Sequence, residues 1–450
     1  MNRLLTLLAI ALLLGPLPGR AELPIEVFQL DNGLTLVVSE DHDTPIFGLS
    51  VVYGVGFRLE PKGRTGFAHL FEHMMFEGTP KAPKGQFVKI IQAGGGTLNG
   101  STRYDYTNYI ATAPVSALAP TLWLEADRMR HLDFSQANLD NQRAVVKEEI
   151  RVNVKNRPYG LFFWTDLAAL AFDKWENAHD GYGAFVDLDR ATIEDVERFH
   201  HTYYSPNNAV IAVSGDVDAK EVLALVKDYF GDIPPAPLPA PPDFSEPLND
   251  AERSAHQTDT HATLPALAVG WKLPGPGGPD FYPLVVLGEL LLGGEAGLLH
   301  QAMVKQHKRF LSVEGGYGWP LGDPSSYAGP TLLALFAIYK PGSDVQENLA
   351  LIQGVIDRIA TDGVDPKRLA AVKTKLVADH YKGLARNIDR ANRLAIAQKL
   401  HGDAGLINRY PEKIRQVTAE QVRQAAAKYL TRANRAWIDR RPATAAEESP

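Results

Sequence analysis

A proline-rich segment near the middle of the chain limits how this sequence can fold. Residues 233–242 read Ile-Pro-Pro-Ala-Pro-Leu-Pro-Ala-Pro-Pro. Because proline fixes φ and has no amide hydrogen, this run forms neither a regular helix nor a central strand, and we expect a stiff, extended linker. It divides the chain of 450 residues into two parts of similar length, each long enough to bury a core of its own.

The two parts share a sequence pattern at a constant offset. Thr192 begins a helix with a capping-box-like sequence, and a turn at Asn208 and an apolar strand follow it. Thr418 begins the same pattern, with Asn434 in the turn, so that 418 − 192 and 434 − 208 both give 226. The recurrence predicts two related α+β domains. The alternative is a chance recurrence of a common helix–turn–strand unit.

These signals predict the organisation of the whole chain. We expect an N-terminal domain at residues 22–232, the linker at 233–255, a related C-terminal domain at 256–441 and a disordered tail at 442–450. Strands are predicted at 34–38, 47–52, 106–113 and 332–338. Helices are predicted at 66–77, 115–129, 138–152, 220–229 and 284–292.

The first 21 residues are typical of a secretory signal peptide. Arg3 precedes an apolar run at residues 4–14, helix breakers at 15–19 and the small residue Ala21, and the run is too short to span a bilayer. We expect cleavage near Ala21 and a periplasmic mature protein without a membrane span. A retained N-terminal anchor is the alternative.

Charge and cysteine content exclude several classes of partner and site. The formal charge of −7 becomes −9 when cleavage removes Arg3 and Arg20 (−7 − 2). The sequence has no basic patch, so nucleic acid is not an expected partner. Cysteine is absent, which excludes disulfides and thiolate ligands. Any metal ion must therefore be held by histidine and carboxylate side chains.

The run His69-Leu-Phe-Glu-His73 predicts such a metal site. It lies in the helix predicted at 66–77, and residues four apart share one face of a helix. The two imidazoles can therefore converge on one ion with Glu72 beside it. A catalytic zinc needs nitrogen ligands, an open position for water and a carboxylate that takes the water's proton. The alternative is a pair of surface histidines on a polar helix face.

Two histidines do not complete a catalytic zinc site, so a third ligand must come from elsewhere. The helix predicted at 138–152 offers Glu148 and Glu149. Here the sequence resembles the insulinase and pitrilysin (M16) family of zinc peptidases, in which the distal ligand is a Glu about 76 positions after the second His. By that spacing (149 − 73 = 76) Glu149 is the matching residue. A solvated helix end is the alternative for this pair of acids.

The resemblance covers nearly all of the mature chain, through segments 66–79, 94–109, 142–149 and 203–216. It implies an α+β fold of two related domains, each a mainly antiparallel β-sheet flanked by α-helices, which form a clam-like chamber for peptides or unfolded segments. The stretch 94–113 then includes an edge strand beside the zinc, and the substrate adds to it as a further strand. Gly96 and Asn99 are the substrate-binding residues expected there, and a plain hairpin loop is the alternative for the glycines.

The sequence departs from the family pattern at Gln142, where many active members have a Glu seven residues before the distal ligand. An amide can orient a neighbouring ligand by hydrogen bonding. It lacks the charge that raises the basicity of the ligand, so the change predicts weaker zinc binding.

A second departure lies in the C-terminal half. Active single-chain members and some partner subunits have an Arg followed seven residues later by a Tyr, both of which contact the scissile region. The corresponding stretch 301–313 gives Lys305 with Ser312, or Val304 with Leu311. The chain therefore resembles the HxxEH-bearing subunit of the bacterial branch similar to the mitochondrial processing peptidase, and we expect a homologous partner that carries the Arg/Tyr pair.

These features predict a zinc-dependent endopeptidase that hydrolyses peptides or unfolded protein segments in the periplasm. In this hypothesis Zn²⁺ binds to His69, His73 and Glu149, and Glu72 is the general base that also passes the proton to the leaving amine. The alternatives are a non-catalytic binding or assembly protein on the same fold, and a self-sufficient homodimeric peptidase.

Overall fold

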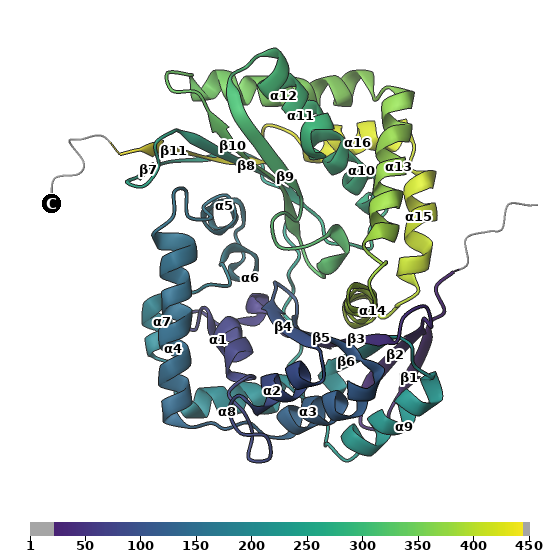
Figure 1. Ribbon diagram of the computed structural model, residues 1–450. Coiled ribbons are helices and arrows are strands. Elements are labelled where there is room, and N and C mark those ends of the chain that lie inside the picture. The colour runs from purple at the N-terminus through teal and green to yellow at the C-terminus, as the bar shows by residue number, and fades with distance from the viewer. Residues whose placement is uncertain (1–21, 444–450) are drawn as a thin grey trace, which may run out of the picture.

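The computed structural model describes residues 22–443, which form two β-sheets with helices packed against them (Figure 1). The predicted signal peptide at 1–21 and residues 444–450 of the predicted tail lie outside the described residues. In the described part of the chain, no helix combines the length and the apolar character needed to cross a membrane.

The first sheet has the strand order β1-β2-β6-β3-β5-β4, and the second has the order β7-β11-β8-β10-β9. The strands of the first sheet are β1 (Glu26–Gln29), β2 (Thr35–Glu40), β3 (Ile46–Tyr53), β4 (Thr97–Thr102), β5 (Thr107–Pro114) and β6 (Ala209–Gly215). Those of the second are β7 (Arg253–Asp259), β8 (Ala266–Leu273), β9 (Phe310–Tyr317), β10 (Thr331–Tyr339) and β11 (Arg435–Pro442).

Helices connect and cover these strands. In the first half they are α1 (Phe67–Met74), α2 (Gln86–Ala93), α3 (Leu118–Arg130), α4 (Gln136–Ile150), α5 (Thr165–Ala171), α6 (Trp175–Ala178), α7 (Phe185–Asp189), α8 (Ile193–Tyr203) and α9 (Ala219–Phe230). In the second they are α10 (Phe281–Leu292), α11 (Leu298–His300), α12 (Val345–Asp362), α13 (Pro366–Lys382), α14 (Asn387–His401), α15 (Leu406–Gln416) and α16 (Ala419–Tyr429).

The two sheets share one design. Strand order β2-β6-β3-β5-β4 in the first corresponds to β7-β11-β8-β10-β9 in the second, and each has one parallel pair, β2 with β6 and β7 with β11. All other neighbours are antiparallel. The predicted α+β fold with two related, mainly antiparallel sheets is therefore confirmed.

The repeated sequence pattern has the same structure in both halves. Thr192 begins α8 and Thr418 begins α16, each with a reciprocal capping box. After each helix an asparagine side chain donates a hydrogen bond to the carbonyl of a preceding tyrosine, Asn208 to Tyr203 at 2.9 Å and Asn434 to Tyr429 at 2.7 Å. The offset of 226 residues thus preserves both the helix start and the turn that leads into the strand.

Each half contributes a helix to the sheet of the other half. Helix α14 packs on β3 and β6 of the first sheet, where Gly48 is required because a Cβ would lie 2.3 Å from the backbone of Asn387. Helix α5 packs on β8 and β11 of the second sheet, in an apolar cluster with Leu167 and Ala268. The sequence predicted two related domains, and this exchange of helices between them was not predicted.

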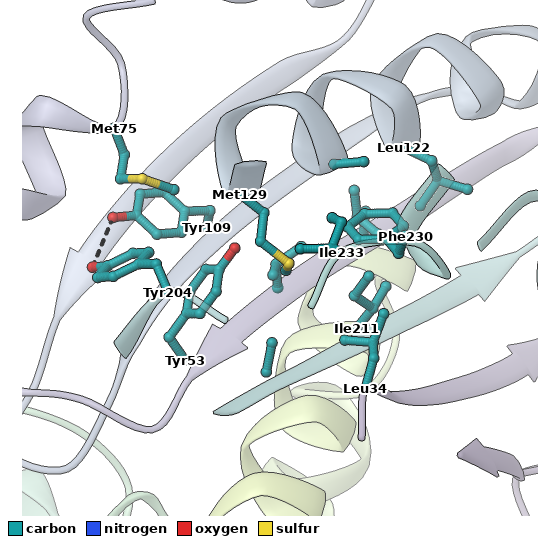
Figure 2. Close-up of a cluster of buried hydrophobic side chains, with 14 of the residues drawn as sticks. Leu34, Tyr53, Met75, Tyr109, Leu122, Met129, Tyr204, Ile211, Phe230 and Ile233 are labelled. Carbon is teal, nitrogen blue, oxygen red and sulfur yellow. Dashed lines mark hydrogen bonds between the residues drawn. The ribbon is translucent and has the colours of Figure 1, made fainter. Parts of the chain in front are cut away.

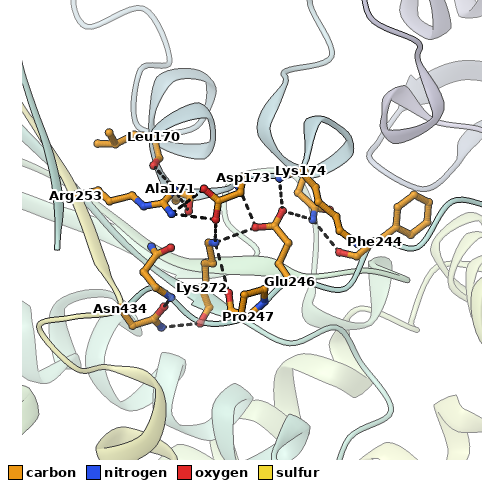
Figure 3. Close-up of polar contacts among 12 residues, drawn as sticks. Leu170, Ala171, Asp173, Lys174, Phe244, Glu246, Pro247, Arg253, Lys272 and Asn434 are labelled. Atoms are coloured by element: carbon orange, nitrogen blue, oxygen red, sulfur yellow. Dashed lines mark hydrogen bonds and ion pairs between the residues drawn. The ribbon is translucent and has the colours of Figure 1, made fainter. Parts of the chain in front are cut away.

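Polar contacts join the linker to both halves (Figure 3). The buried Lys272 of β8 binds Glu246 of the linker at 2.8 Å and Asp173, which follows α5, at 3.1 Å. A buried ammonium group is tolerated here because two carboxylates surround it. Strand β7 begins at Arg253, inside the segment predicted as linker, because this part of the chain pairs with β11.

The core of the first half lies between its sheet and the helices on the face opposite α14. Figure 2 shows part of this core, where the hydroxyl groups of Tyr109 on β5 and Tyr204 after α8 lie 3.2 Å apart. Helix α1 contributes Leu70, Phe71 and Met74 to the same cluster. The opposite face of α1 is therefore left for polar side chains.

Candidate metal centre

Helix α1 is held at its N-terminus by a buried carboxylate. Gly66 precedes the helix with φ of 77°, and a Cβ there would lie 2.4 Å from the carbonyl oxygen of Tyr182. Glu60 accepts hydrogen bonds from the amides of Gly66 at 3.0 Å and Ala68 at 2.7 Å. A carboxylate is favourable at this end of a helix because the free N–H groups point toward it. The orientation of α1 is thereby set.

Two histidines and one glutamate converge beside α1. Nε2 of His69 and Nε2 of His73 lie 3.3 Å apart on one helix face. Oε2 of Glu149, near the end of α4, lies 3.5 Å from each of these nitrogens. Ligand atoms about 2.1 Å from a tetrahedral zinc stand about 3.4 Å from one another. The three atoms therefore have the separations that a zinc ion requires.

The electrostatics differ among the three residues. Burial alone would lower the pKa of His73, but the carboxylates of Glu149 and Glu72 raise it above its usual value. Burial lowers the pKa of His69 to about 4, so its imidazole is neutral and able to coordinate. Hydrogen bonding to His73 is the main cause that lowers the pKa of Glu149, which keeps its carboxylate charged. The side chains of the three residues are 13%, 22% and 32% exposed, which leaves room for a water molecule. By contrast, Glu148 is exposed and binds Arg151 at 3.0 Å.

Glu72 lies on α1 between the two histidines and faces strand β4. Its Oε2 accepts a hydrogen bond of 2.6 Å from the hydroxyl of Thr102. Burial raises the pKa of the Glu72 carboxyl group above its usual value, although the Thr102 bond acts in the opposite direction. A Cβ at Gly100 would stand 3.0 Å from Oε1 of Glu72, so the glycine permits the close approach of the strand.

Gln142 lies on α4 two turns before Glu149. Its side-chain oxygen is 3.2 Å from Nδ1 of His73, and the side chain is buried. The amide therefore contacts the ring nitrogen on the side away from Glu149. In contrast, Nδ1 of His69 is buried and has no hydrogen-bond partner among residues 22–443.

The two residues expected to bind substrate lie in different environments. Strand β4 is at the edge of the first sheet, and Asn99 on it is exposed, with its Oδ1 accepting a hydrogen bond from the amide of Gly100 at 3.0 Å. Gly96 precedes β4, and a Cβ there would lie 2.8 Å from Ala113 and from Ile91. Close packing between α2 and β5 thus accounts for this glycine without a ligand.

Sequence reasoning missed Glu60, Thr102 and Gly100, because each acts through a contact between separate elements. The glycines at 94–96 were noticed as a cluster, whereas Gly100 is a single glycine within a strand. A glycine inside a strand is often a place where another group approaches closely, and this was the available signal. Glu60 and Thr102 carried no comparable signal.

The stretch 301–313 lies in the second half, across a wide helical turn at Gln301–Gln306 and the start of β9. Lys305 is exposed and lies 3.8 Å from the carboxylate of Glu295. Val304 packs against the core of the second half, and Leu311 is exposed on β9. None of these side chains provides a guanidinium or a phenol.

Comparison with known families identifies the chain. Residues 36–162 match the family described as Insulinase (Peptidase family M16), and residues 190–376 match the Peptidase M16 inactive domain. The chain belongs to the M16 peptidase family. The zinc protease PqqE of Helicobacter pylori is 29% identical over 377 residues, which are 82% of each protein. Like other M16 peptidases, this chain is thus related to zinc proteases.

Solved structures agree with this assignment. A protease from Helicobacter pylori superposes with a TM-score of 0.86 over 93% of this M16 chain and 100% of that one, at 25% identity. The periplasmic protease PqqL from Escherichia coli gives a TM-score of 0.73 at 18% identity, over 93% of this chain and 48% of that protein. The second likeness concerns the fold alone.

Proposed function

We propose that this M16 protein is a zinc-dependent endopeptidase that hydrolyses peptides or unfolded protein segments in the periplasm. The observation that carries the proposal is the spacing of 3.3 to 3.5 Å among Nε2 of His69, Nε2 of His73 and Oε2 of Glu149. The signal-like sequence at residues 1–21 and the likeness to a protease named as periplasmic support the location.

The residues around this group have separate roles in hydrolysis. A zinc ion held by the three ligands would lower the pKa of a bound water and polarise the substrate carbonyl. Glu72 accepts the proton of the attacking water and gives it to the leaving amine. Its raised carboxyl pKa suits both steps, because a base works best when its pKa is near the operating pH. Thr102 holds Oε2, so Oε1 is the oxygen that takes the proton.

The edge of β4 positions the substrate. A peptide that adds to β4 as a further strand gains main-chain hydrogen bonds and lies along the side of α1 that carries Glu72. Asn99 is exposed on this strand and is available to the peptide backbone.

We further propose that the protein acts as the catalytic subunit of a heterodimer. Tetrahedral intermediates need donors for the developing oxyanion, and the stretch 301–313 offers neither an Arg nor a Tyr at the family positions. A homologous exported subunit with the Arg/Tyr pair would supply both donors.

The test of the hydrolytic proposal is the variant Glu72→Gln. It removes the proton acceptor and leaves all three ligands, so we expect full zinc content, a native circular dichroism spectrum and nearly complete loss of peptide hydrolysis. Zinc is measured by atomic emission on purified protein, and hydrolysis on an unstructured fluorogenic peptide in the presence of the proposed partner subunit. Undiminished cleavage by this variant would show that the general base is wrong, and wild-type protein without zinc would contradict the metal assignment.

A further inference from the structure

A buried carboxylate lies behind the amide that contacts His73. Nε2 of Gln142 donates a hydrogen bond of 2.7 Å to Oε1 of Glu77, while Oε1 of the same amide lies 3.2 Å from Nδ1 of His73. Both Gln142 and Glu77 are buried, with 8% and 4% of their surface exposed. The three side chains form a line from carboxylate through amide to imidazole.

Glu77 determines which way the amide points. An ionised carboxylate only accepts hydrogen bonds, so the NH₂ group of Gln142 must face Glu77 and its oxygen must face His73. An oxygen acceptor requires that Nδ1 of His73 carries the hydrogen. In the neutral ring Nε2 is then unprotonated, and Nε2 is the atom that faces His69 and Glu149. The metal-binding tautomer of His73 thus follows from the charge on Glu77.

The position of Glu77 is unfavourable for a carboxylate that has no partners. Its amide bonds to the carbonyl of Met74, the last residue of α1, and a negative charge at the C-terminal end of a helix is unfavourable. Lys84 lies 2.5 Å from its second oxygen, so the buried carboxylate is compensated on both sides. The contacts with Lys84 and Gln142 hold the Glu77 side chain beside the amide.

We propose that Glu77 is a positioning residue of the metal site, which orients Gln142 and thereby keeps His73 protonated at Nδ1. The inference rests on the zinc site proposed above. Gln142 was expected to weaken zinc binding because it lacks a negative charge. Under this proposal Glu77 supplies that charge, and the Gln142 amide connects it to the His73 ring. Partners that orient a ligating histidine typically affect metal affinity by about 10- to 100-fold when removed.

Two variants separate an effect of charge from an effect of packing. Glu77→Gln keeps the shape of the side chain but lets the Gln142 amide rotate, and we expect zinc affinity to fall by about 10- to 100-fold. In the double variant Glu77→Gln/Gln142→Glu a carboxylate lies directly beside His73, and we expect most of the affinity to return. Zinc affinity is measured by competition with a chromophoric chelator. Glu148→Gln, an exposed acid on the same helix as the ligand Glu149, is the control and should leave affinity unchanged.

A measurement on metal-free protein tests the same inference independently of zinc. At a pH above the raised pKa of His73, where the ring is neutral, long-range ¹H–¹⁵N correlations should show protonation at Nδ1 in the wild type and a gain of the Nε2-protonated form in Glu77→Gln. Failure of the wild type to bind zinc would refute the proposed function, while this spectrum would still report on Glu77. An unchanged spectrum with wild-type zinc affinity in folded Glu77→Gln overturns the inference. The inference is also overturned if Glu77→Gln and the double variant Glu77→Gln/Gln142→Glu lose zinc affinity equally.

Discussion

Gly100 on β4 faces Glu72 on α1 so closely that a methyl group on its Cα would stand 3.0 Å from Oε1 of the carboxylate. The same methyl would lie 3.2 Å from the ring of Phe76. One face of the Glu72 carboxylate is therefore covered by strand backbone, and the separation between β4 and this carboxylate depends on a missing side chain.

Gly100→Ala should reduce turnover without removing zinc. The added carbon moves either Glu72 or the strand by a few tenths of an ångström or more, and small misplacements of reacting groups cost up to about 100-fold in rate. With the proposed partner subunit present, we expect kcat to fall by about 10- to 100-fold while metal content stays at the wild-type level. Gly354→Ala in α12, where a Cβ meets no atom within 4 Å, is the control. Wild-type kcat in Gly100→Ala would show that this contact is not needed.

Replacement of the two neighbouring acids on α4 should have unequal effects on zinc. Glu149→Gln removes the carboxylate that lies 3.5 Å from both histidines, whereas Glu148→Gln removes only an exposed partner of Arg151. We expect large loss of zinc from the first variant and none from the second. Metal content after dialysis against a weak chelator measures the difference. Equal loss in both variants, or the reverse order, would refute the assignment of Glu149.

His179 should make stability depend on pH. Its two ring nitrogens lie 2.7 Å and 2.6 Å from the carbonyl oxygens of Trp175 and Phe57, so both must carry hydrogen, and Glu60 is 3.5 Å away. Burial alone would lower the pKa of His179, but these partners raise it above 6.5. A raised pKa means that the folded state holds its proton more tightly than the unfolded state. The stabilisation is therefore complete below pH 6.5 and lost as pH rises through the folded pKa.

The variant His179→Gln isolates this contribution. We expect it to lower the free energy of unfolding by about 1–3 kcal/mol near pH 6, with a smaller difference from wild type at alkaline pH. Urea denaturation at several pH values measures the difference. A loss of stability that is the same at every pH would mean that the ring contributes packing and no charge.

The isolated chain should hydrolyse peptides weakly or not at all. Removal of one oxyanion donor typically costs about 10² to 10³ in turnover, and this chain lacks both donors at the family positions. Addition of an exported homologue with the Arg/Tyr pair should restore activity, and replacement of that pair should abolish the gain. The assay compares hydrolysis at fixed zinc with and without the partner. Full activity of the isolated chain, unchanged by the partner, would refute the heterodimer and leave the zinc chemistry intact.

The convergence of His69, His73 and Glu149 was predictable from the sequence because it follows from helical periodicity and a family spacing. His69 and His73 share a helix face by helical periodicity, and Glu149 was chosen over Glu148 by its distance along the chain. Residues that contact each other from separate helices and strands have no such signal in the sequence. Thr102 reaches Glu72 over 30 positions and Gln142 reaches Glu77 over 65, and these contacts depend on how β4 and α4 pack against α1.

The parts of the fold that depend on local sequence signals were also predictable. Capping boxes and apolar alternation located the predicted helices and strands within a few residues, since these signals act between near neighbours. The helices α12 to α15 of the second half were not predicted. Boundaries moved where tertiary contacts decided them: α4 begins two residues before its predicted start because Ser135 caps it, and β7 extends into the linker. For α14, apolar periodicity would in any case not show which sheet covers its buried face.

The exchange of α5 and α14 means that the proline-rich segment separates two sequence repeats without separating two folding units. If the backbone were cut there, each fragment would keep one strand-rich layer and lose the helix that shields its second face, so apolar residues such as Val52 and Ala268 would meet water. We expect such fragments to fold together and not separately. Each half of the chain therefore relies on a helix of the other half to cover one face of its sheet.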